Sequence, residues 1–193
     1  MNDYLIRQRL KNNLVQLHAN EKDTLIIEEL GLKHGVSRID LAVINGTLHG
    51  YEIKSDEDTL DRLPAQSITY NLIFDYVTLV VGYRHAYPAL NLIPEWWGIQ
   101  IVENTGTGEA LIYTLREANQ NPTRDVYSIV KLLWRDEAIN ILDKISSADG
   151  VRSKPRKSVY EKLILAAEEN TICELVRNQL KSRQNWRVHL LQE

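Results

Sequence analysis

The chain has 193 residues, of which 44% are hydrophobic and 25% are charged, and its formal net charge at pH 7 is −3. This composition is typical of a globular protein and excludes disordered, collagen-like and coiled-coil chains, and the single cysteine, Cys173, excludes a disulfide scaffold and a cysteine-rich zinc site. No apolar run approaches the length that crosses a membrane and the N-terminus lacks a secretory pattern, so we expect a cytoplasmic protein with no membrane contact.

The charge is distributed unevenly along the chain. Residues 1–150 hold 14 Lys and Arg against 21 Asp and Glu, a balance of −7, whereas residues 151–193 hold 9 against 5, a balance of +4. A basic C-terminal region can contact nucleic acid, but an acidic body does not resemble a surface that coats DNA. We therefore expect the body to meet DNA only at a site where a metal ion neutralises carboxylates.

The first part of the chain predicts a helix followed by three strands. Apolar residues recur at three- and four-residue spacing over residues 4–18, as in an amphipathic helix. Three short runs rich in β-branched and apolar residues then predict strands at residues 24–32, 38–44 and 48–54. Asn45-Gly46 predicts a two-residue hairpin turn between the last two, because both residue types tolerate a positive φ.

A second helix and a buried strand follow. Residues 59–74 predict a helix in which Pro64 either lies in the first turn or introduces a kink. The apolar run at residues 76–81 predicts a strand buried on both faces. Because a helix separates this strand from the one at 48–54, we expect the two to pair in parallel through a right-handed crossover.

The second half of the chain is predicted to be mostly helical. A weak helix at residues 87–92 and strands at 97–102 and 111–115 precede a helical pattern from residue 123 onward. The patterns Ser158-x-x-Glu161 and Thr171-x-x-Glu174 have the form of capping boxes and predict helices at 159–168 and 172–184. The predicted fold class is α/β (α+β) with a mixed central sheet. Residues 1–116 form its core, and residues 117–193 form a helical, partly basic C-terminal region.

The candidate chemistry is concentrated at Asp40, Glu52 and Lys54. Glu52 and Lys54 are two apart on one strand, so their side chains share a face. The tightest hairpin register places Asp40 near Tyr51, and a shift of one residue places it beside Glu52. Two carboxylates and the carbonyl of Ile53 are oxygen ligands of the kind that Mg²⁺ takes, and Lys54 would orient or deprotonate a water activated by the metal.

The pattern Asp-x11-Glu-x-Lys formed by Asp40, Glu52 and Lys54, in the order helix, three strands, helix, strand, resembles the PD-(D/E)XK nuclease superfamily. Gln66 and Tyr70 match the Gln-x-x-x-Tyr motif of its RecB-like members, where the pair contacts the DNA backbone or the catalytic residues. The resemblance covers residues 4–81 and is greatest to small bacterial and phage-associated members. The proline in the superfamily name is absent, because isoleucine precedes the aspartate here.

This resemblance implies a restriction-endonuclease-like αβββαβ core and the metal-dependent hydrolysis of DNA phosphodiester bonds, leaving a 5′-phosphate. In that interpretation Asp40 and Glu52 bind Mg²⁺ or Mn²⁺, Lys54 assists the attacking water, and Gln66 and Tyr70 position the substrate backbone. Many members act on two strands as dimers, so a homodimer is the expected assembly.

One further acid is needed to match many members of the superfamily, which supply it from the first helix. The first helix of this chain has no acid after Asp3. We therefore expect Glu29, on the first predicted strand, to serve as the additional catalytic acid. Glu28 is the alternative, because alternation along a strand does not decide which of the two neighbours faces the site.

A basic linker precedes the two last predicted helices. Its cationic residues are Arg152, Lys154, Arg156 and Lys157. We expect them to contact DNA phosphates, and the alternative is a solvated basic surface. Two other functions are compatible with the sequence. A catalytically inactive DNA-binding or repair-accessory module on the same fold would bind DNA without metal, and a protein that interacts with a partner in phage–host conflict would not bind DNA.

Overall fold

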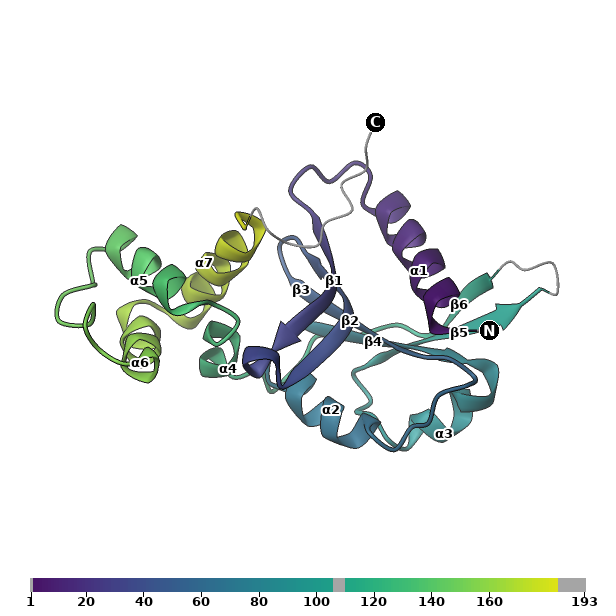
Figure 1. The fold of residues 1–193 in the computed structure, drawn as a ribbon. Helices are drawn as coiled ribbons and strands as arrows, with labels where there is room; N and C mark the ends of the chain where they lie inside the picture. The colour runs from purple at the N-terminus through teal and green to yellow at the C-terminus, as the bar shows by residue number, and fades with distance from the viewer. Residues whose placement is uncertain (1, 106–109, 184–193) are drawn as a thin grey trace.

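The computed structural model describes residues 2–105 and 110–183, which form a six-stranded sheet with helices on both faces (Figure 1). The strands are β1 (Leu25–Leu32), β2 (Ser37–Ile44), β3 (Leu48–Lys54), β4 (Tyr76–Gly82), β5 (Gly98–Asn104) and β6 (Ala110–Arg116). The helices are α1 (Asp3–Leu17), α2 (Leu63–Asn71), α3 (Ala86–Leu90), α4 (Val126–Val130), α5 (Arg135–Lys144), α6 (Arg156–Ala166) and α7 (Glu169–Lys181). Within these residues no helix is both long and apolar enough to cross a membrane.

The sheet is mixed, as the sequence predicts. The strands follow one another in chain order across the sheet, with antiparallel pairs β1–β2, β2–β3 and β5–β6. The pairs β3–β4 and β4–β5 are parallel, which confirms the parallel pairing expected across α2. The helix at α2 is shorter than predicted, and Pro64 lies in its first turn rather than at a kink.

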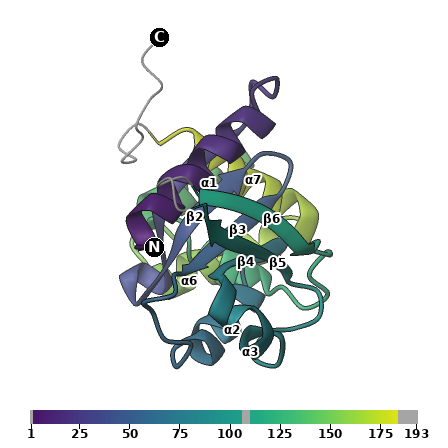
Figure 2. The same cartoon turned by 90° about the vertical axis from the view of Figure 1, so that its right-hand side faces the viewer.

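The two faces of the sheet are covered by different helices, as Figures 1 and 2 show. Helix α1 packs on one face, where Ile6, Leu10 and Leu14 join side chains of β2, β3 and β4 in a small core cluster. Helices α2 and α3 cover the other face (Figure 1), and their buried side chains belong to a larger cluster that continues into the C-terminal helices. Because Tyr70 and Phe74 of that cluster are fully buried, the α2 segment is held firmly against β3 and β4.

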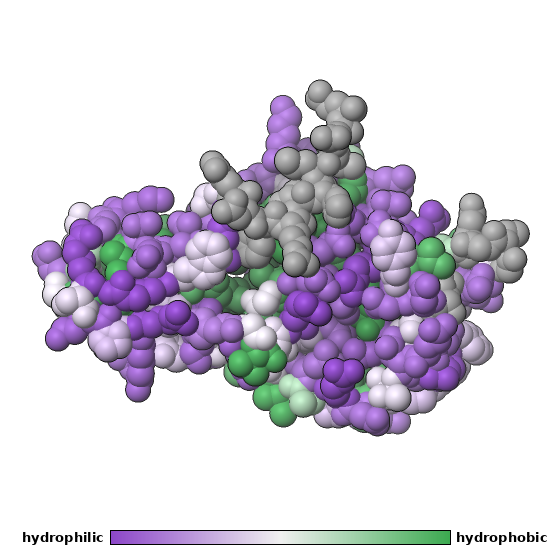
Figure 3. All heavy atoms as spheres, viewed as in Figure 1, coloured by the Kyte–Doolittle hydropathy of each residue, from purple (hydrophilic) through white to green (hydrophobic). Residues whose placement is uncertain are grey.

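Helices α4 to α7 form a group beside the sheet, and their exposed surface is largely hydrophilic in the view of Figure 3. Their buried residues, including Leu142 and Leu163, belong to the same core cluster as the sheet residues. A buried ion pair ties the group together, since Arg183 donates to both carboxylate oxygens of Glu137. The predicted boundary after residue 116 coincides with the end of β6.

The hairpin between β2 and β3 corrects one prediction. Ile44 pairs with Leu48, so the loop has three residues, and neither Asn45 nor Gly46 has a positive φ. The side-chain oxygen of Asn45 instead accepts hydrogen bonds from the backbone N–H and the hydroxyl of Thr47, at 3.0 and 3.1 Å. The two-residue turn was therefore wrong, because the asparagine side chain closes a longer loop.

The two predicted capping boxes are also wrong. Ser158 and Thr171 lie inside α6 and α7, which start two residues earlier at Arg156 and Glu169. Neither Pro155 nor Glu168, which precede these helices, makes a side-chain capping bond. Proline has the backbone angle that precedes or starts a helix, so α6 begins without a serine cap. The last residue of the helix predicted at 172–184 lies outside the described residues.

Gly50 provides a test of the packing of β3 against Ile39 of β2 and Phe74, which follows α2. A Cβ atom at this position would lie 2.4 Å from Cδ1 of Ile39 and 3.1 Å from the ring of Phe74. We expect Gly50→Ala to lower the free energy of unfolding by about 1–3 kcal/mol, measured by urea denaturation. Gly31→Ala is the control, because a Cβ there meets no atom within 4 Å and is expected to change stability by less than about 0.5 kcal/mol. Equal losses in both variants would contradict this packing.

Candidate functional site

The loop length of the β2–β3 hairpin sets which residues of the two strands lie opposite each other. Ile44 pairs with Leu48 and Leu41 pairs with Tyr51. Continued by one residue, this register brings Asp40 level with Glu52. The register is thus shifted by one residue from the tightest one, because the loop contains one residue more than a two-residue turn.

Strand β2 changes its orientation at Asp40. Residues two apart on a strand normally face the same side. Leu41, however, belongs to the core cluster under α1, whereas Ile39 belongs to the cluster on the α2 side. The regular alternation of side chains between the two faces of the sheet is therefore interrupted between Ile39 and Leu41. Asp40 is the residue at the interruption.

Strand β1 carries a matching irregularity at Glu29. This residue has a φ of 56°, which is uncommon and costly for a residue with a side chain. Glu28 pairs with Leu41 and Leu30 pairs with Ile39, so Glu29 and Asp40 are opposite each other but form no regular pair. Both strands are thus irregular at the same position. The pairing register is the same before and after it, and the two acids point toward α1.

Asp40 is held where β2 separates from β3. Its Oδ2 accepts a hydrogen bond of 2.8 Å from the backbone N–H of Ile53, in a position beyond the last regular pair of the two strands. The separation leaves a polar cleft of about 490 Å³. The cleft is lined by Asp3, Arg7, Val36, Ser37, Arg38, Asp40, Glu52, Ile53, Lys54, Asp58, Arg62 and Gln66.

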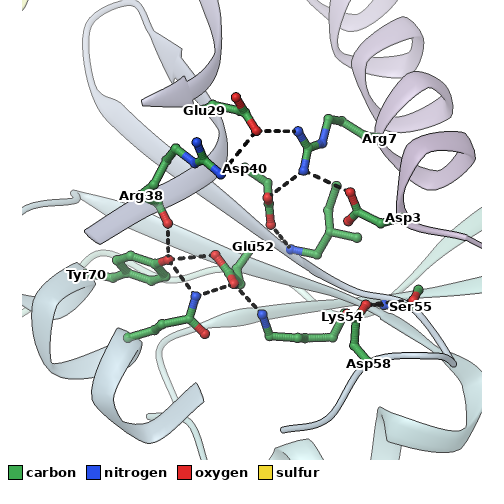
Figure 4. A network of polar contacts seen from close by, with 12 residues as sticks. Asp3, Arg7, Glu29, Arg38, Asp40, Glu52, Lys54, Ser55, Asp58 and Tyr70 are labelled. Atoms are coloured by element: carbon green, nitrogen blue, oxygen red, sulfur yellow. Dashed lines mark hydrogen bonds and ion pairs between the residues drawn. The ribbon is translucent and has the colours of Figure 1, made fainter. Parts of the chain in front are cut away.

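Glu52 lies at the floor of this cleft with only 2% of its surface exposed. Its Oε1 accepts hydrogen bonds of 2.6 Å from Nζ of Lys54 and from Nε2 of Gln66, and its Oε2 lies 2.7 Å from the hydroxyl of Tyr70 (Figure 4). Gln66 and Tyr70 are four apart on α2 and so reach Glu52 from one helix face. The structure therefore brings together four of the predicted site residues in one hydrogen-bonded group.

A residue that sequence reasoning missed connects the other acids. The guanidinium of Arg7 on α1 donates to Oδ1 of Asp40 and to Oδ2 of Asp3, both at 2.9 Å, and to Oε1 of Glu29 at 3.2 Å. Only its spacing of four from Asp3 was visible in the sequence. Helix α1 thus supplies both the cation Arg7 and the acid Asp3 to the cleft that holds Asp40.

The structure separates the two glutamates between which the sequence left a choice. Glu29 reaches the site through Arg7, and it also lies 3.4 Å from a guanidinium nitrogen of Arg38. Neither glutamate lines the cleft, and Glu28 instead pairs with Lys11 on α1. Of the two, Glu29 is the one placed beside the candidate site.

The residues of the basic linker lie on the helical group and not in the cleft. Arg152 pairs with Asp143, and Lys157 lies 3.8 Å from Glu161 in the next turn of α6. Arg156 starts α6 and lines a second hollow. Lys154 is exposed to solvent. Because none of the four residues lines the cleft, they do not contact its acids.

Burial and the neighbouring charge of Glu52 dominate the electrostatics of Asp40. Together they raise the pKa of Asp40 to about 7, although the N–H of Ile53 and the charge of Arg7 oppose the shift. The pKa of Tyr70 is also raised, by burial first and then by the charge of Glu52. Tyr70 therefore remains a neutral donor at physiological pH, and its single hydroxyl hydrogen serves both Glu52 and the carbonyl of Arg38, 2.8 Å away.

The donor set of the cleft meets the minimum that Mg²⁺ requires, which is one or two carboxylates completed by water and substrate oxygens. Asp40 and Glu52 supply two. The Oε1 atom of Gln66 is buried beside them without a hydrogen-bond partner in the described structure. No group of three or more His, Cys, Asp or Glu arranged for a metal ion occurs among residues 2–105 and 110–183.

Comparisons with known proteins relate the whole chain to a phage family. The family model described as bacteriophage P4 protein cII matches residues 1–192. Protein cII of Enterobacteria phage P4 is 43% identical over 58 residues, a match that covers 30% of this chain and only 22% of that protein. A solved protein of unknown function from Silicibacter pomeroyi is similar with a TM-score of 0.44 and 20% identity, over 80% of this chain and 100% of that one.

The raised pKa of Asp40 makes the stability of the protein depend on pH. Between about pH 4 and pH 7 the folded state holds a proton that the unfolded state has released, so the contribution of Asp40 is full below pH 4 and is lost as pH rises through 7. We expect the stability of Asp40→Asn relative to the native protein to increase by on the order of 1–3 kcal/mol from about pH 5 to about pH 8. Denaturant unfolding at both values measures it, and a constant difference would contradict the assignment.

Proposed function

Because the chain belongs to the bacteriophage P4 protein cII family and that description names no reaction, we propose a function from the site: metal-dependent hydrolysis of DNA phosphodiester bonds. The observation that carries the proposal is the convergence of Asp40, Glu52 and Lys54, from adjacent strands, in one polar cleft. Gln66 and Tyr70 bind Glu52 from behind, as the resemblance to RecB-like nucleases implies.

The order of elements supports the same proposal. The chain runs α1, β1, β2, β3, α2, β4, which is the αβββαβ order of a restriction-endonuclease-like core. The acids lie where β2 leaves β3, and the amine of Lys54 lies at the C-terminal end of β3. We propose on these grounds that residues 3–82 form a PD-(D/E)XK core.

The roles of the residues follow from their contacts. Asp40 and Glu52 would hold Mg²⁺ or Mn²⁺, which, when bound, lowers the pKa of a coordinated water and neutralises charge on the phosphate. Lys54, whose Nζ is 2.6 Å from Glu52, would orient the attacking water or stabilise the developing charge. Gln66 and Tyr70 fix the rotamer of Glu52, so they act as positioning residues in the absence of substrate.

Arg7 and Glu29 act through Asp40. Arg7 bonds the carboxylate of Asp40 directly, and Glu29 accepts from the same guanidinium. Neither needs to touch a substrate to matter, because together they fix the direction in which the Asp40 carboxylate points. We therefore propose Glu29 as a positioning residue rather than the additional catalytic acid.

An inactive DNA-binding module on the same fold is the second candidate, and a specific observation favours it. Each carboxylate oxygen of Asp40 and Glu52 already has a protein donor, and two of these donors are the cations Arg7 and Lys54. A site that neutralises its own acids needs no metal to be stable. DNA as the partner is common to both candidates.

Metal binding separates the two candidates. If Asp40 and Glu52 hold a divalent cation, saturating Mg²⁺ or Mn²⁺ stabilises the folded state by about 2.7 kcal/mol at one hundred times the dissociation constant, raising the melting temperature by about 5–10 °C. Asp40→Asn is expected to lose this rise. A melting temperature that is independent of metal in the native protein would support the inactive module.

Cleavage tests the reaction itself. We expect plasmid and single-stranded DNA to be cut in the presence of Mg²⁺ or Mn²⁺, and Lys54→Ala to slow the cutting by about 10²–10⁴-fold. Lys22→Ala is the matched control, because Lys22 is exposed in the turn between α1 and β1. If both variants cut like the native protein, the activity comes from elsewhere and the proposed site is wrong.

A further inference from the structure

A second hollow lies where the sheet meets the helical group. Its volume is about 320 Å³. It is lined by Leu30, Gly31, His34, Gly35, Lys131, Leu132, Leu133, Trp134, Arg156 and Arg183. These residues come from the end of β1, from the turn after it and from the region of α4, α5, α6 and α7, so the hollow is built by both halves of the molecule.

The lining of this hollow is basic and contains no carboxylate, in contrast to the cleft that holds Asp40 and Glu52. Lys131 and Arg156 have no salt-bridge partner within the described ranges. All three side chains, Lys131, Arg156 and His34, line the hollow, and the two cations lower the pKa of His34 after the larger effect of its burial. Arg183 is the exception, because Glu137 neutralises it. A cationic hollow without acids favours an anionic ligand.

An exposed aromatic side chain stands at the same hollow. Trp134 is 60% exposed, although large apolar side chains are usually buried. The guanidinium of Arg183 lies 4.7 Å from the centre of its ring, and the backbone N–H of Trp134 donates to Glu137. The indole is thus anchored at the start of α5 while much of its surface faces solvent. Aromatic rings held in this way beside cations are platforms on which unpaired bases stack.

The hollow and the acidic cleft share one wall. His34 and Gly35 line the hollow, and the three residues that follow, Val36 to Arg38, line the cleft. The turn between β1 and β2 stands between them, next to α4 in Figure 1. Lys33 and His34 both have positive φ values, of 48° and 58°, a costly backbone that persists only where its surroundings fix it.

We propose that this hollow is a subsite for single-stranded nucleic acid, in which Lys131, Arg156 and His34 contact backbone phosphates and Trp134 stacks on a base. The inference rests on the proposed function, because the same nucleic-acid chain whose phosphate enters the acidic cleft would continue into the hollow. It assigns the substrate class as a nucleic acid with an unpaired flank, since a base within a duplex offers no free face to an indole.

Binding without metal tests the subsite independently of catalysis. Fluorescence anisotropy with a labelled single-stranded oligonucleotide, in EDTA, is the measurement. We expect the double variant Lys131→Gln/Arg156→Gln to bind about 10-fold or more weakly, with a salt dependence reduced by about 1.4 in the log–log slope. The double variant Lys144→Gln/Lys162→Gln is the matched control. It also removes two positive charges, from exposed side chains of α5 and α6 that do not line the hollow.

Stacking has its own variants. Trp134→Ala is expected to weaken binding about 5- to 100-fold, while Trp134→Phe stays within about threefold of the native protein because a ring is retained. Thermal melting of each variant checks that the fold is intact, and Trp134→Phe keeps the test valid if Trp134→Ala unfolds. Equal binding by native protein and Trp134→Phe together with strong loss in a folded Trp134→Ala supports the stacking role.

The outcomes distinguish this inference from the proposed function. Weaker binding by Lys131→Gln/Arg156→Gln with native-like binding by Lys144→Gln/Lys162→Gln supports the subsite, even if no DNA is cut. Native-like binding by both overturns the subsite and leaves the nuclease proposal standing. If the native protein binds a blunt duplex as tightly as the single strand and Trp134→Ala changes neither, the assignment to unpaired nucleic acid is wrong. No binding by the native protein overturns the subsite outright.

Discussion

The structure depends on how two buried carboxylates are kept next to each other. Asp40 and Glu52 repel, and burial penalises both charges, so the fold must surround them with donors. It does so from three directions: Arg7 from α1, Gln66 and Tyr70 from α2, and Lys54 together with the Ile53 N–H from β3 itself. The helices on both faces of the sheet thus contact the same pair of acids. The contacts that satisfy these acids also hold α1 and α2 against the sheet.

The irregular backbone of β1 and β2 also helps to place the acids beside their donors. A regular strand would place Asp40 on the face opposite to Leu41, away from α1 and Arg7. The step at Glu29 and Asp40 turns both acids toward Arg7 while Ile39 and Leu30 remain in the core on the α2 side. The conformational free energy that a positive φ costs at Glu29 is therefore offset by the contacts of Glu29 with Arg7 and Arg38. Strain of this kind is typical of positions where function and regular structure compete.

The sequence predicted the mixed sheet, the parallel crossover and the grouping of Gln66 and Tyr70, because these follow from periodicity, chain order and helix spacing. It did not predict the role of Arg7, whose partners lie 22 and 33 residues away and share no local pattern with it. It misplaced the starts of α6 and α7, since Ser158 and Thr171 have capping-box spacing in positions that the structure uses as helix interior. It also left Glu28 and Glu29 undecided, because the break in alternation at Glu29 is set by the tertiary contacts of the site.

The three-residue loop between β2 and β3 has a consequence for how related chains are compared. Strand register changes only in whole residues, and each step moves every side chain to the other face. The number of residues in the loop therefore determines whether Asp40 lies opposite Glu52 or opposite Tyr51. Deleting one residue from it would leave the apolar composition of both strands intact while dissolving the acidic pair. The number of residues between Asp40 and Glu52 therefore decides, together with the residue types, whether the two acids meet.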